Sequence, residues 1–339
     1  MTTDEKFMHE AIKLARKGAG KTQPNPTVGC VLVKNGRVIG SGWHRRAGSP
    51  HAEVEALRSL RDPALTRGAT AYVTLEPCST HGRTPPCTET LLASGITRVV
   101  IGAIDANPKH RGRGMRLLAK AGVKIKSGVL GKECTALNPE FDYVMRTGLP
   151  WVIAKCGMSL DGRLTRPPGE GQWITSPAAR RDAMKLRATA NAVMVGAGTV
   201  RADDPALTVR GIRDAKQPLR VIWAPRALPP KTSKLMREMK AGGVLVLRQK
   251  NLRAALRELG KRGVQRVLLE GGGHTLGCAF DGNLVQEVVL YVAPMLSGGA
   301  IPAVGGRGCA KIAGAIGLTD IVYQRIGACL KMAGNPRKL

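Results

Sequence analysis

The sequence is poor in aromatic and acidic residues. Phenylalanine, tryptophan and tyrosine make up 3% of the 339 residues, which disfavours a single-strand nucleic-acid binder that stacks bases on aromatic rings. Acidic residues number 24 against 53 lysines and arginines, so the net charge is +29. A positive field of this size attracts anions, including nucleic acids, phosphorylated metabolites and nucleotide cofactors. A solvated basic surface without a specific partner explains the charge equally well.

Long hydrophobic runs are also missing. No stretch of about 18 apolar residues occurs, so no membrane-spanning helix is expected. Residues 1–6 are polar and partly acidic, unlike a signal or transit peptide. The eight cysteines are scattered, and only Cys78 and Cys87 have the spacing of metal ligands. These features predict a cytoplasmic protein with reduced cysteines and no membrane partner.

Strand-like and helix-like segments alternate through both halves of the chain. The predicted strands cover residues 28–33, 38–43, 70–75, 98–101, 123–125, 151–156, 192–195, 219–222, 244–247, 267–269 and 288–292. The predicted helices cover residues 3–18, 51–60, 87–93, 114–121, 177–188, 231–239, 252–260 and 275–280. The alternation predicts an α/β fold. A chain of this length suits two domains, which we place at 1–147 and 148–339 because turn-forming residues occupy 146–150.

The richest cluster of chemically active residues is His51-Ala52-Glu53, followed by Cys78 and Cys87. One histidine and two cysteines can bind Zn²⁺ and leave its fourth position open for water. A carboxylate two residues from the ligand histidine, Glu53, can then shuttle protons for that water. A structural zinc site would normally use four protein ligands and leave Glu53 without a task. A disulfide between Cys78 and Cys87 is another alternative, but it needs an oxidising compartment. The alternative role for Glu53 is a carboxylate that stabilises a helix N-terminus.

The cysteine spacing makes the pattern more specific. Zinc nucleobase deaminases typically carry H-x-E followed by P-C-x-x-C, whereas eight residues lie between the two cysteines here. With the runs Pro24-Asn25-Pro26-Thr27-Val28-Gly29 and His81-Gly82-Arg83-Thr84-Pro85-Pro86-Cys87, this half resembles the bifunctional deaminase/reductase family of riboflavin biosynthesis. The spacing disfavours transfer-RNA and cytidine deaminases, which normally keep two residues between the cysteines.

The resemblance implies a cytidine-deaminase-like α/β/α sandwich that binds zinc through His51, Cys78 and Cys87. Glu53 would be the catalytic residue that removes the 2-amino group of a diaminopyrimidinone ribosylamine 5′-phosphate. Three further residues are implied substrate contacts: Asn25, His81 and Arg83. An Asn-Pro turn is the alternative role for Asn25, and a structural loop role is the alternative for His81.

In the second half, residues 196–199 and 270–273 are Gly-rich turns that each follow a strand and precede a helix. Such turns can present backbone N–H groups to phosphate, and close packing of the turn is the alternative explanation. Residues 155–162, 172–176 and 198–210 resemble the reductase half of the same family. The resemblance implies a dihydrofolate-reductase-like α/β domain that passes hydride from NADPH to the open ribosyl chain of the substrate.

The residues of this reductase half that match the family fall into two groups. The implied cofactor contacts are Gly157, Trp173, Thr199, Asp203, Gly272 and Gly273. The implied substrate contacts are Lys155, Arg187, Leu207, Arg210 and Glu270, with Arg187 and Arg210 gripping the phosphate.

The chain departs from the family pattern in several places. Gly171 replaces a common serine, Asn191 and Gln286 replace acidic residues, and residues 326–329 lack an acidic pair. A monofunctional deaminase with a non-catalytic second domain therefore remains an alternative, and an RNA-associated protein is another. The expected partners are a phosphorylated pyrimidine and further copies of the chain in a homo-oligomer, rather than nucleic acid or a membrane.

Overall fold

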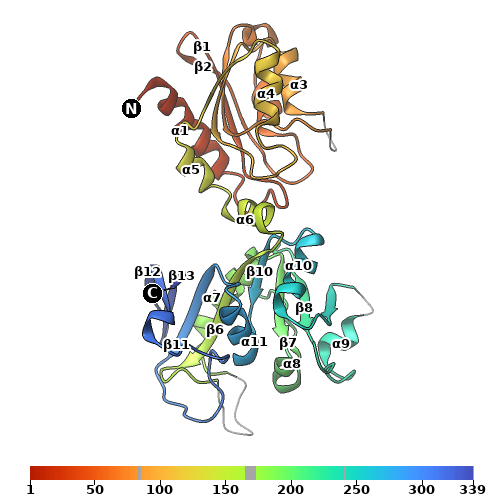
Figure 1. Ribbon diagram of the computed structural model, residues 1–339, viewed down its shortest axis with the longest axis vertical. Helices are drawn as coiled ribbons and strands as arrows, with labels where there is room; N and C mark the ends of the chain where they lie inside the picture. The colour runs from red at the N-terminus through yellow and green to blue at the C-terminus, as the bar shows by residue number, and fades with distance from the viewer. Residues whose placement is uncertain (82–84, 165–172, 240–241, 339) are drawn as a thin grey trace. The chain divides into compact units, whose positions relative to one another are not determined.

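The chain folds into two compact units, Met1–Gly148 and Leu149–Leu339. The computed structural model describes residues 1–81, 85–164, 173–239 and 242–338 (Figure 1). Each unit has its own sheet and its own buried core, so the two are described separately. Among the described residues, no helix combines the length and the apolar character needed to cross a membrane.

The first unit is built on a five-stranded sheet of order β2-β1-β3-β4-β5. Its strands are β1 (Gly29–Lys34), β2 (Arg37–Trp43), β3 (Thr70–Leu75), β4 (Arg98–Ala103) and β5 (Lys124–Ser127). Strands β1 and β2 form an antiparallel hairpin whose turn residues Asn35 and Gly36 both have positive φ, at 50° and 71°. Strand β1 is also antiparallel to β3, whereas β3, β4 and β5 run parallel.

Helices cover both faces of this sheet (Figure 1). They are α1 (Thr3–Arg16), α2 (Ala52–Arg58), α3 (Cys87–Ala93), α4 (Arg113–Lys120) and α5 (Gly131–Thr135), and α6 (Pro139–Thr147) follows at the end of the unit. Successive strand residues point to opposite faces, so Val31 packs with α1 and α5 in one cluster while Leu32 packs with α2, α3 and α4 in the other. The predicted α/β/α sandwich is confirmed.

The second unit is built on an eight-stranded sheet of order β12-β13-β11-β6-β10-β7-β8-β9. Its strands are β6 (Trp151–Ser159), β7 (Ala192–Gly196), β8 (Leu219–Trp223), β9 (Val244–Leu247), β10 (Arg266–Leu269), β11 (Glu287–Ala293), β12 (Ile316–Ile326) and β13 (Cys329–Lys338). All neighbours pair in parallel except the hairpin β12–β13 and its junction with β11, which are antiparallel.

The second unit also packs helices against its sheet. They are α7 (Pro177–Thr189), α8 (Ala197–Asp203), α9 (Lys234–Glu238), α10 (Leu252–Lys261) and α11 (Gly273–Asp281). The core contains Ile153 and Leu268 from the central strands together with Ala179 and Ala183 from α7. This mixed sheet with packed helices confirms the α/β class expected for the second half.

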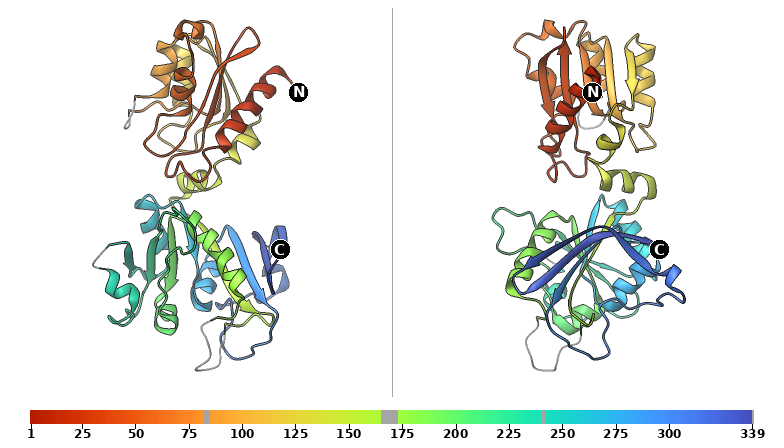
Figure 2. Two further views of the ribbon diagram at one scale, coloured as in Figure 1. Left: turned by 180° about the vertical axis from the view of Figure 1, so that it is seen from behind. Right: turned by 90° about the vertical axis from the view of Figure 1, so that its left-hand side faces the viewer.

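The predicted segments do not include α5, α6, α8 or the hairpin β12–β13 (Figure 2). The three helices span five, nine and seven residues, too short for a clear helical periodicity. Strand β12 has no buried position along its length, so it lacks the alternation of buried and exposed positions that marks a half-buried strand. Its pairing with β13 and β11 depends on tertiary contacts.

Candidate active sites

The first candidate site joins the three predicted zinc ligands. His51 is the N-cap of α2, Cys78 follows β3, and Cys87 is the first residue of α3. The Nδ1 atom of His51 lies 3.2 Å from Cys87 Sγ and 3.5 Å from Cys78 Sγ, and the three ligand atoms all lie within 4.8 Å of one another. Tetrahedral zinc with ordinary Zn–N and Zn–S bonds separates such atoms by about 3.5 Å. The cluster therefore has the size that zinc requires.

Thiolate character is already favoured at this cluster. The thiol of Cys87, the backbone N–H of Cys87 at 3.3 Å and the imidazole of His51 all stabilise the Cys78 thiolate and lower the pKa of Cys78. Hydrogen bonding to Cys78 and burial raise the pKa of Cys87. A divalent cation would satisfy both sulfurs at once, because zinc binds cysteine as the thiolate.

Glu53 lies in the first turn of α2, with only 3% of its surface exposed. Burial, followed by the nearby charge of Cys78, raises the pKa of the Glu53 carboxyl. A carboxyl with a raised pKa takes up a proton more readily than an ordinary glutamate and can release it again. This is the property that a proton shuttle beside the cluster needs.

The three predicted substrate residues of this unit differ in position. Asn25 lies next to a buried histidine, His44, whose Nε2 is 3.2 Å from Asn25 Nδ2. His81 is exposed, with Nε2 3.6 Å from the carboxylate of Glu89. Arg83 lies outside the described residues. Sequence reasoning missed His44, although its place directly after a predicted strand and seven residues before His51 was visible.

His44 contacts the ligand region in two ways. Its Nδ1 lies 3.0 Å from the carbonyl oxygen of Pro50, the residue before His51. Its ring meets the His51 ring edge-on, with 5.4 Å between centroids. Burial lowers the pKa of His44, which favours the neutral imidazole at this position.

Glu76 is a second residue that sequence reasoning missed. Its side chain is buried, two residues before Cys78. The carboxylate accepts hydrogen bonds of 2.8–3.3 Å from the backbone N–H groups of Asp105, Gly112, Gly114 and Met115. These donors include the first turn of α4, whose N–H groups have no partner within the helix. Glu76 thus ties the end of β3 to the start of α4 and fixes the approach of the chain to Cys78.

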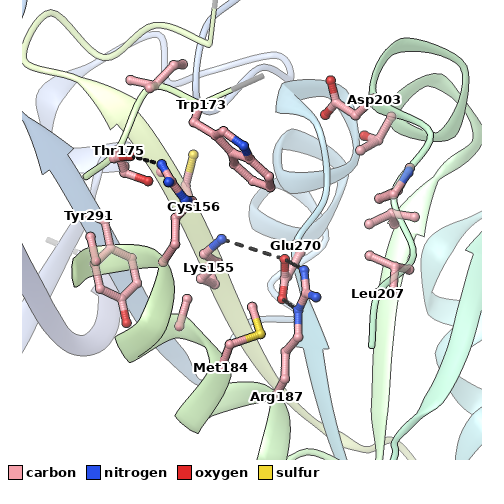
Figure 3. Close-up of a pocket in the computed structure, with 18 of the residues that line it drawn as sticks. Lys155, Cys156, Trp173, Thr175, Met184, Arg187, Asp203, Leu207, Glu270 and Tyr291 are labelled. Carbon is pink, nitrogen blue, oxygen red and sulfur yellow. Dashed lines mark hydrogen bonds and ion pairs between the residues drawn. The ribbon is translucent and has the colours of Figure 1, made fainter. Parts of the chain in front are cut away.

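The second candidate site is a cavity of about 600 Å³ within the second unit (Figure 3). It opens where the parallel strands β6, β7 and β10 end, the usual place for ligands in α/β sheets. The predicted residues that line it are Lys155, Gly157, Trp173, Arg187, Thr199, Asp203, Leu207, Arg210, Glu270 and Gly272. Of the predicted reductase residues only Gly273 does not line it: a side chain there would meet the Pro302 carbonyl oxygen at 2.2 Å, which indicates a packing role.

A buried ion cluster forms one wall of this cavity. Arg187 donates from Nε and Nη2 to the two oxygens of Glu270 at 2.6 and 2.8 Å, and from Nη1 to the Thr208 carbonyl at 2.9 Å. The Nζ atom of Lys155 lies 3.6 Å from Glu270. Burial alone would raise the pKa of Glu270, but the charges of Lys155 and Arg187 outweigh it and lower the pKa to about 2. Glu270 is therefore ionised at neutral pH, and three of the five donors of Arg187 are occupied.

Trp173 reaches the cavity from the opposite side to Arg187 (Figure 3). Trp173 is 57% exposed, and its ring centroid lies 4.9 Å from the guanidinium carbon of Arg180, which donates to the Thr175 carbonyl at 2.7 Å. Arg180 was not among the predicted residues, although it also lines the cavity. An exposed tryptophan backed by a cation is a surface on which a flat, anionic ligand can stack.

Each Gly-rich turn packs against the helix that follows the other turn: Gly196 faces α11, and Gly272 faces α8. A side-chain carbon at Gly196 would meet Thr275 Oγ1 at 2.4 Å, and one at Gly272 (φ +46°) would meet Thr199 Oγ1 at 2.8 Å. Close packing of these turns therefore requires glycine at both positions. Gly272 also lines the cavity, so packing and ligand approach are compatible there.

The described residues that depart from the family pattern form hydrogen bonds with backbone N–H groups. The Asn191 side-chain oxygen accepts from the N–H groups of Gln265 and Arg266, and that of Gln286 accepts from Val152. In the tail, Cys329 Sγ accepts from the backbone N–H of Ser176. Neither amide is among the cavity-lining residues. Gly171 lies outside the described residues.

Comparison with known proteins gives matches over both units. Residues 150–329 match the family described as the RibD C-terminal domain. Residues 1–103 match the cytidine and deoxycytidylate deaminase zinc-binding region. The first match alone spans more than half of the chain.

Curated relatives and solved structures agree with these matches. The Riboflavin biosynthesis protein RibD of Escherichia coli (strain K12) is 41% identical, over 87% of this chain and 89% of the relative. A structure of Acinetobacter baumannii RibD superposes with a TM-score of 0.86 at 36% identity and 99% coverage of both chains. A Thermotoga maritima structure described as a diaminohydroxyphosphoribosylaminopyrimidine deaminase/5-amino-6-(5-phosphoribosylamino)uracil reductase has a TM-score of 0.79 at 31% identity, again with 99% coverage of both chains.

Proposed function

The chain belongs to the RibD family of riboflavin biosynthesis proteins, and from this premise we propose the reaction that each of its sites carries out. It is a bifunctional enzyme with a deaminase and a reductase activity. We assign the deaminase to residues 1–147 and the reductase to residues 148–339. The proposed substrate of the first site is 2,5-diamino-6-ribosylamino-4-pyrimidinone 5′-phosphate, which loses its 2-amino group as ammonia. The activity for which the Thermotoga maritima relative is named supports this choice.

The deaminase proposal depends most on one observation: the possible ligand atoms of His51, Cys78 and Cys87 lie together, and Cys87 contacts the buried carboxyl of Glu53. Zinc at His51, Cys78 and Cys87 supplies, when bound, a water acidified to near-neutral pKa. Glu53 takes up a proton as the ring carbon is attacked and delivers it to the leaving amino nitrogen. Its raised pKa suits both steps, because the group must be deprotonated first and protonated later.

The reductase uses a nicotinamide cofactor, and we propose NADPH. A nicotinamide cofactor supplies hydride, which here reduces the ribosyl chain of the deaminated substrate to a ribityl chain. Gly157, Trp173, Thr199, Asp203 and Gly272 would lie along it, whereas Gly273, which does not line the cavity, would support this wall by packing against Pro302. The cations Lys155, Arg180 and Arg210 line the cavity and suit two phosphorylated ligands.

The substrate side of the cavity would be formed by Lys155, Arg187, Leu207, Arg210 and Glu270. Arg210 is exposed, and no ion pair of its side chain occurs among the described residues, so it suits the phosphate. Arg187 is held by Glu270 and would reach the substrate through its remaining donors. In the first unit, the corresponding contacts would come from Asn25, His81 and Arg83.

Compartment and assembly are further proposals. All eight cysteines are free thiols, which supports the reducing environment of the cytoplasm. Strand β12 lies at an edge of its sheet and exposes Val322 and Tyr323 by 61% and 62%. An exposed apolar edge strand invites pairing with another chain, which supports a homo-oligomer. Light scattering coupled to gel filtration tests the assembly.

Product analysis by mass tests the two activities together. Purified, zinc-loaded enzyme is incubated with the diaminopyrimidinone substrate alone, with NADPH or with NADH. We expect deamination in all three samples and the ribityl product most rapidly with NADPH. Deamination without any ribityl product would contradict the reductase assignment, and equal rates with NADH would contradict the choice of NADPH. No reaction in a zinc-loaded sample would refute the proposed substrate.

A further inference from the structure

His44 is a buried histidine that the proposed reaction leaves without a task. It follows β2, and only 2% of its surface is exposed. Its two ring nitrogens contact Asn25 and the Pro50 carbonyl, and its ring edge contacts His51. These contacts join His44 to a predicted substrate residue, Asn25, to the predicted zinc ligand His51 and to the residue that precedes this ligand.

The hydrogen bonds of His44 have a defined direction. The carbonyl oxygen of Pro50 can only accept, so Nδ1 of His44, 3.0 Å away, carries the proton. In a neutral imidazole Nε2 then has a lone pair and accepts, so the group facing it at 3.2 Å is the amide NH2 of Asn25. The direction of each bond follows from the one before it, starting at a backbone group that cannot change its role.

This direction decides what Asn25 can offer to a ligand. With its NH2 group on His44, the Asn25 side chain turns its oxygen away, and that oxygen has no hydrogen-bond partner among the described residues. Asn25 is only partly buried. An amide held in this orientation presents an acceptor, whereas a freely rotating amide could present either an acceptor or a donor.

We propose that His44 is a positioning residue that fixes the Asn25 amide, so that the amide oxygen accepts a hydrogen bond from an N–H group of the pyrimidine. The inference rests on the proposed deaminase function and deepens it by naming the kind of ring edge that is read. The amino group that deamination leaves on the ring supplies such a donor in both the substrate and the product. A pyrimidine with a carbonyl at this edge would face the Asn25 oxygen with a second acceptor and would bind more weakly.

A double-mutant cycle tests the proposal. His44→Phe keeps an aromatic ring against His51 but loses both ring nitrogens, and Asn25→Ala removes the amide. We expect each single change to raise KM for ammonia release, and the Kd of the deaminated product in calorimetry, by about 10- to 100-fold. If His44 acts through Asn25, the double variant loses no more than the larger single effect. Zinc content and the reductase rate of the same protein serve as controls and should not change.

A second variant covers the case in which His44→Phe does not fold. His44→Gln retains one donor and one acceptor, so we expect it to bind the product more tightly than His44→Phe does. If His44→Phe is insoluble, His44→Gln should still bind the product measurably. Equal losses in the Gln and Phe variants, or loss of all product binding by a folded, zinc-loaded His44→Gln protein, would overturn the proposal. Additive losses in the cycle would also overturn it, since His44 would then act independently of Asn25.

The same measurements separate this inference from the proposed function. Wild-type protein that neither releases ammonia from the diaminopyrimidinone nor binds its product would refute both. Wild-type protein that does both, combined with an additive cycle or with zinc loss in His44→Phe, would refute only the role of His44 in orienting Asn25.

Discussion

Replacing Glu270 by glutamine should strongly destabilise the second unit. The Glu270 side chain is 7% exposed, and it accepts two hydrogen bonds from Arg187 and pairs with Lys155. The Arg187 and Lys155 side chains are 11% and 19% exposed. Glu270→Gln preserves the shape but leaves two largely buried cations without a counter-charge. Breaking such a buried pair typically costs about 3–5 kcal/mol.

The pKa of Glu270 gives an independent magnitude. The surrounding cations lower it from 4.5 to about 2 in the folded protein, which corresponds to roughly 3 kcal/mol of stability at neutral pH. Because the folded pKa is depressed, this contribution is complete above pH 4.5 and is lost as the pH falls towards 2. The stability difference between wild type and Glu270→Gln should therefore shrink through the same window.

Denaturant unfolding followed by tryptophan fluorescence measures this effect. Three of the four tryptophans, Trp151, Trp173 and Trp223, lie in the second unit. Glu270→Gln should lower the free energy of unfolding of the second unit by about 3 kcal/mol, which corresponds to a Tm lower by about 10 °C. Glu258→Gln is the matched control, because Glu258 forms a partly exposed pair with Arg262 and its loss should cost less than about 1 kcal/mol. A change of under about 1 kcal/mol in Glu270→Gln, or a difference independent of pH from 4.5 to 2, would refute the reasoning.

Three further predictions concern the first unit. Glu53→Gln should keep its zinc and its reductase activity but release ammonia about 10²–10⁴ times more slowly; a fully active variant in an ammonia assay would overturn the proton-shuttle role. Cys87→Ser should lose zinc, as measured by elemental analysis, and unchanged zinc content would remove Cys87 from the ligand set. Glu76→Gln places an amide NH2 against backbone donors that now share a carboxylate, so the first unit should lose about 2–3 kcal/mol in thermal unfolding while the reductase stays active; an unchanged melting curve would contradict this role.

Local patterns were enough to predict much of the architecture and the metal cluster. Strand β3 and helix α3 lie at their predicted bounds, and the Asn35-Gly36 hairpin is present. The clustering of His51, Cys78 and Cys87, the proposed zinc ligands, was predictable because metal ligation restricts both residue type and spacing. Such features depend on neighbours in the chain, or on chemistry that few residue types can perform.

Contacts between distant segments depended on the tertiary structure. Glu270 meets Arg187 across 83 positions, and the Glu76 carboxylate collects N–H groups from residues 29 to 39 positions away. No local pattern marks these pairings, because the sheet order decides which strand ends and helix starts come together. The amide of Asn25 shows the difference most clearly: the family resemblance implies an amide near the base, whereas only the fold brings His44 to it and so fixes which of its atoms is left for a ligand.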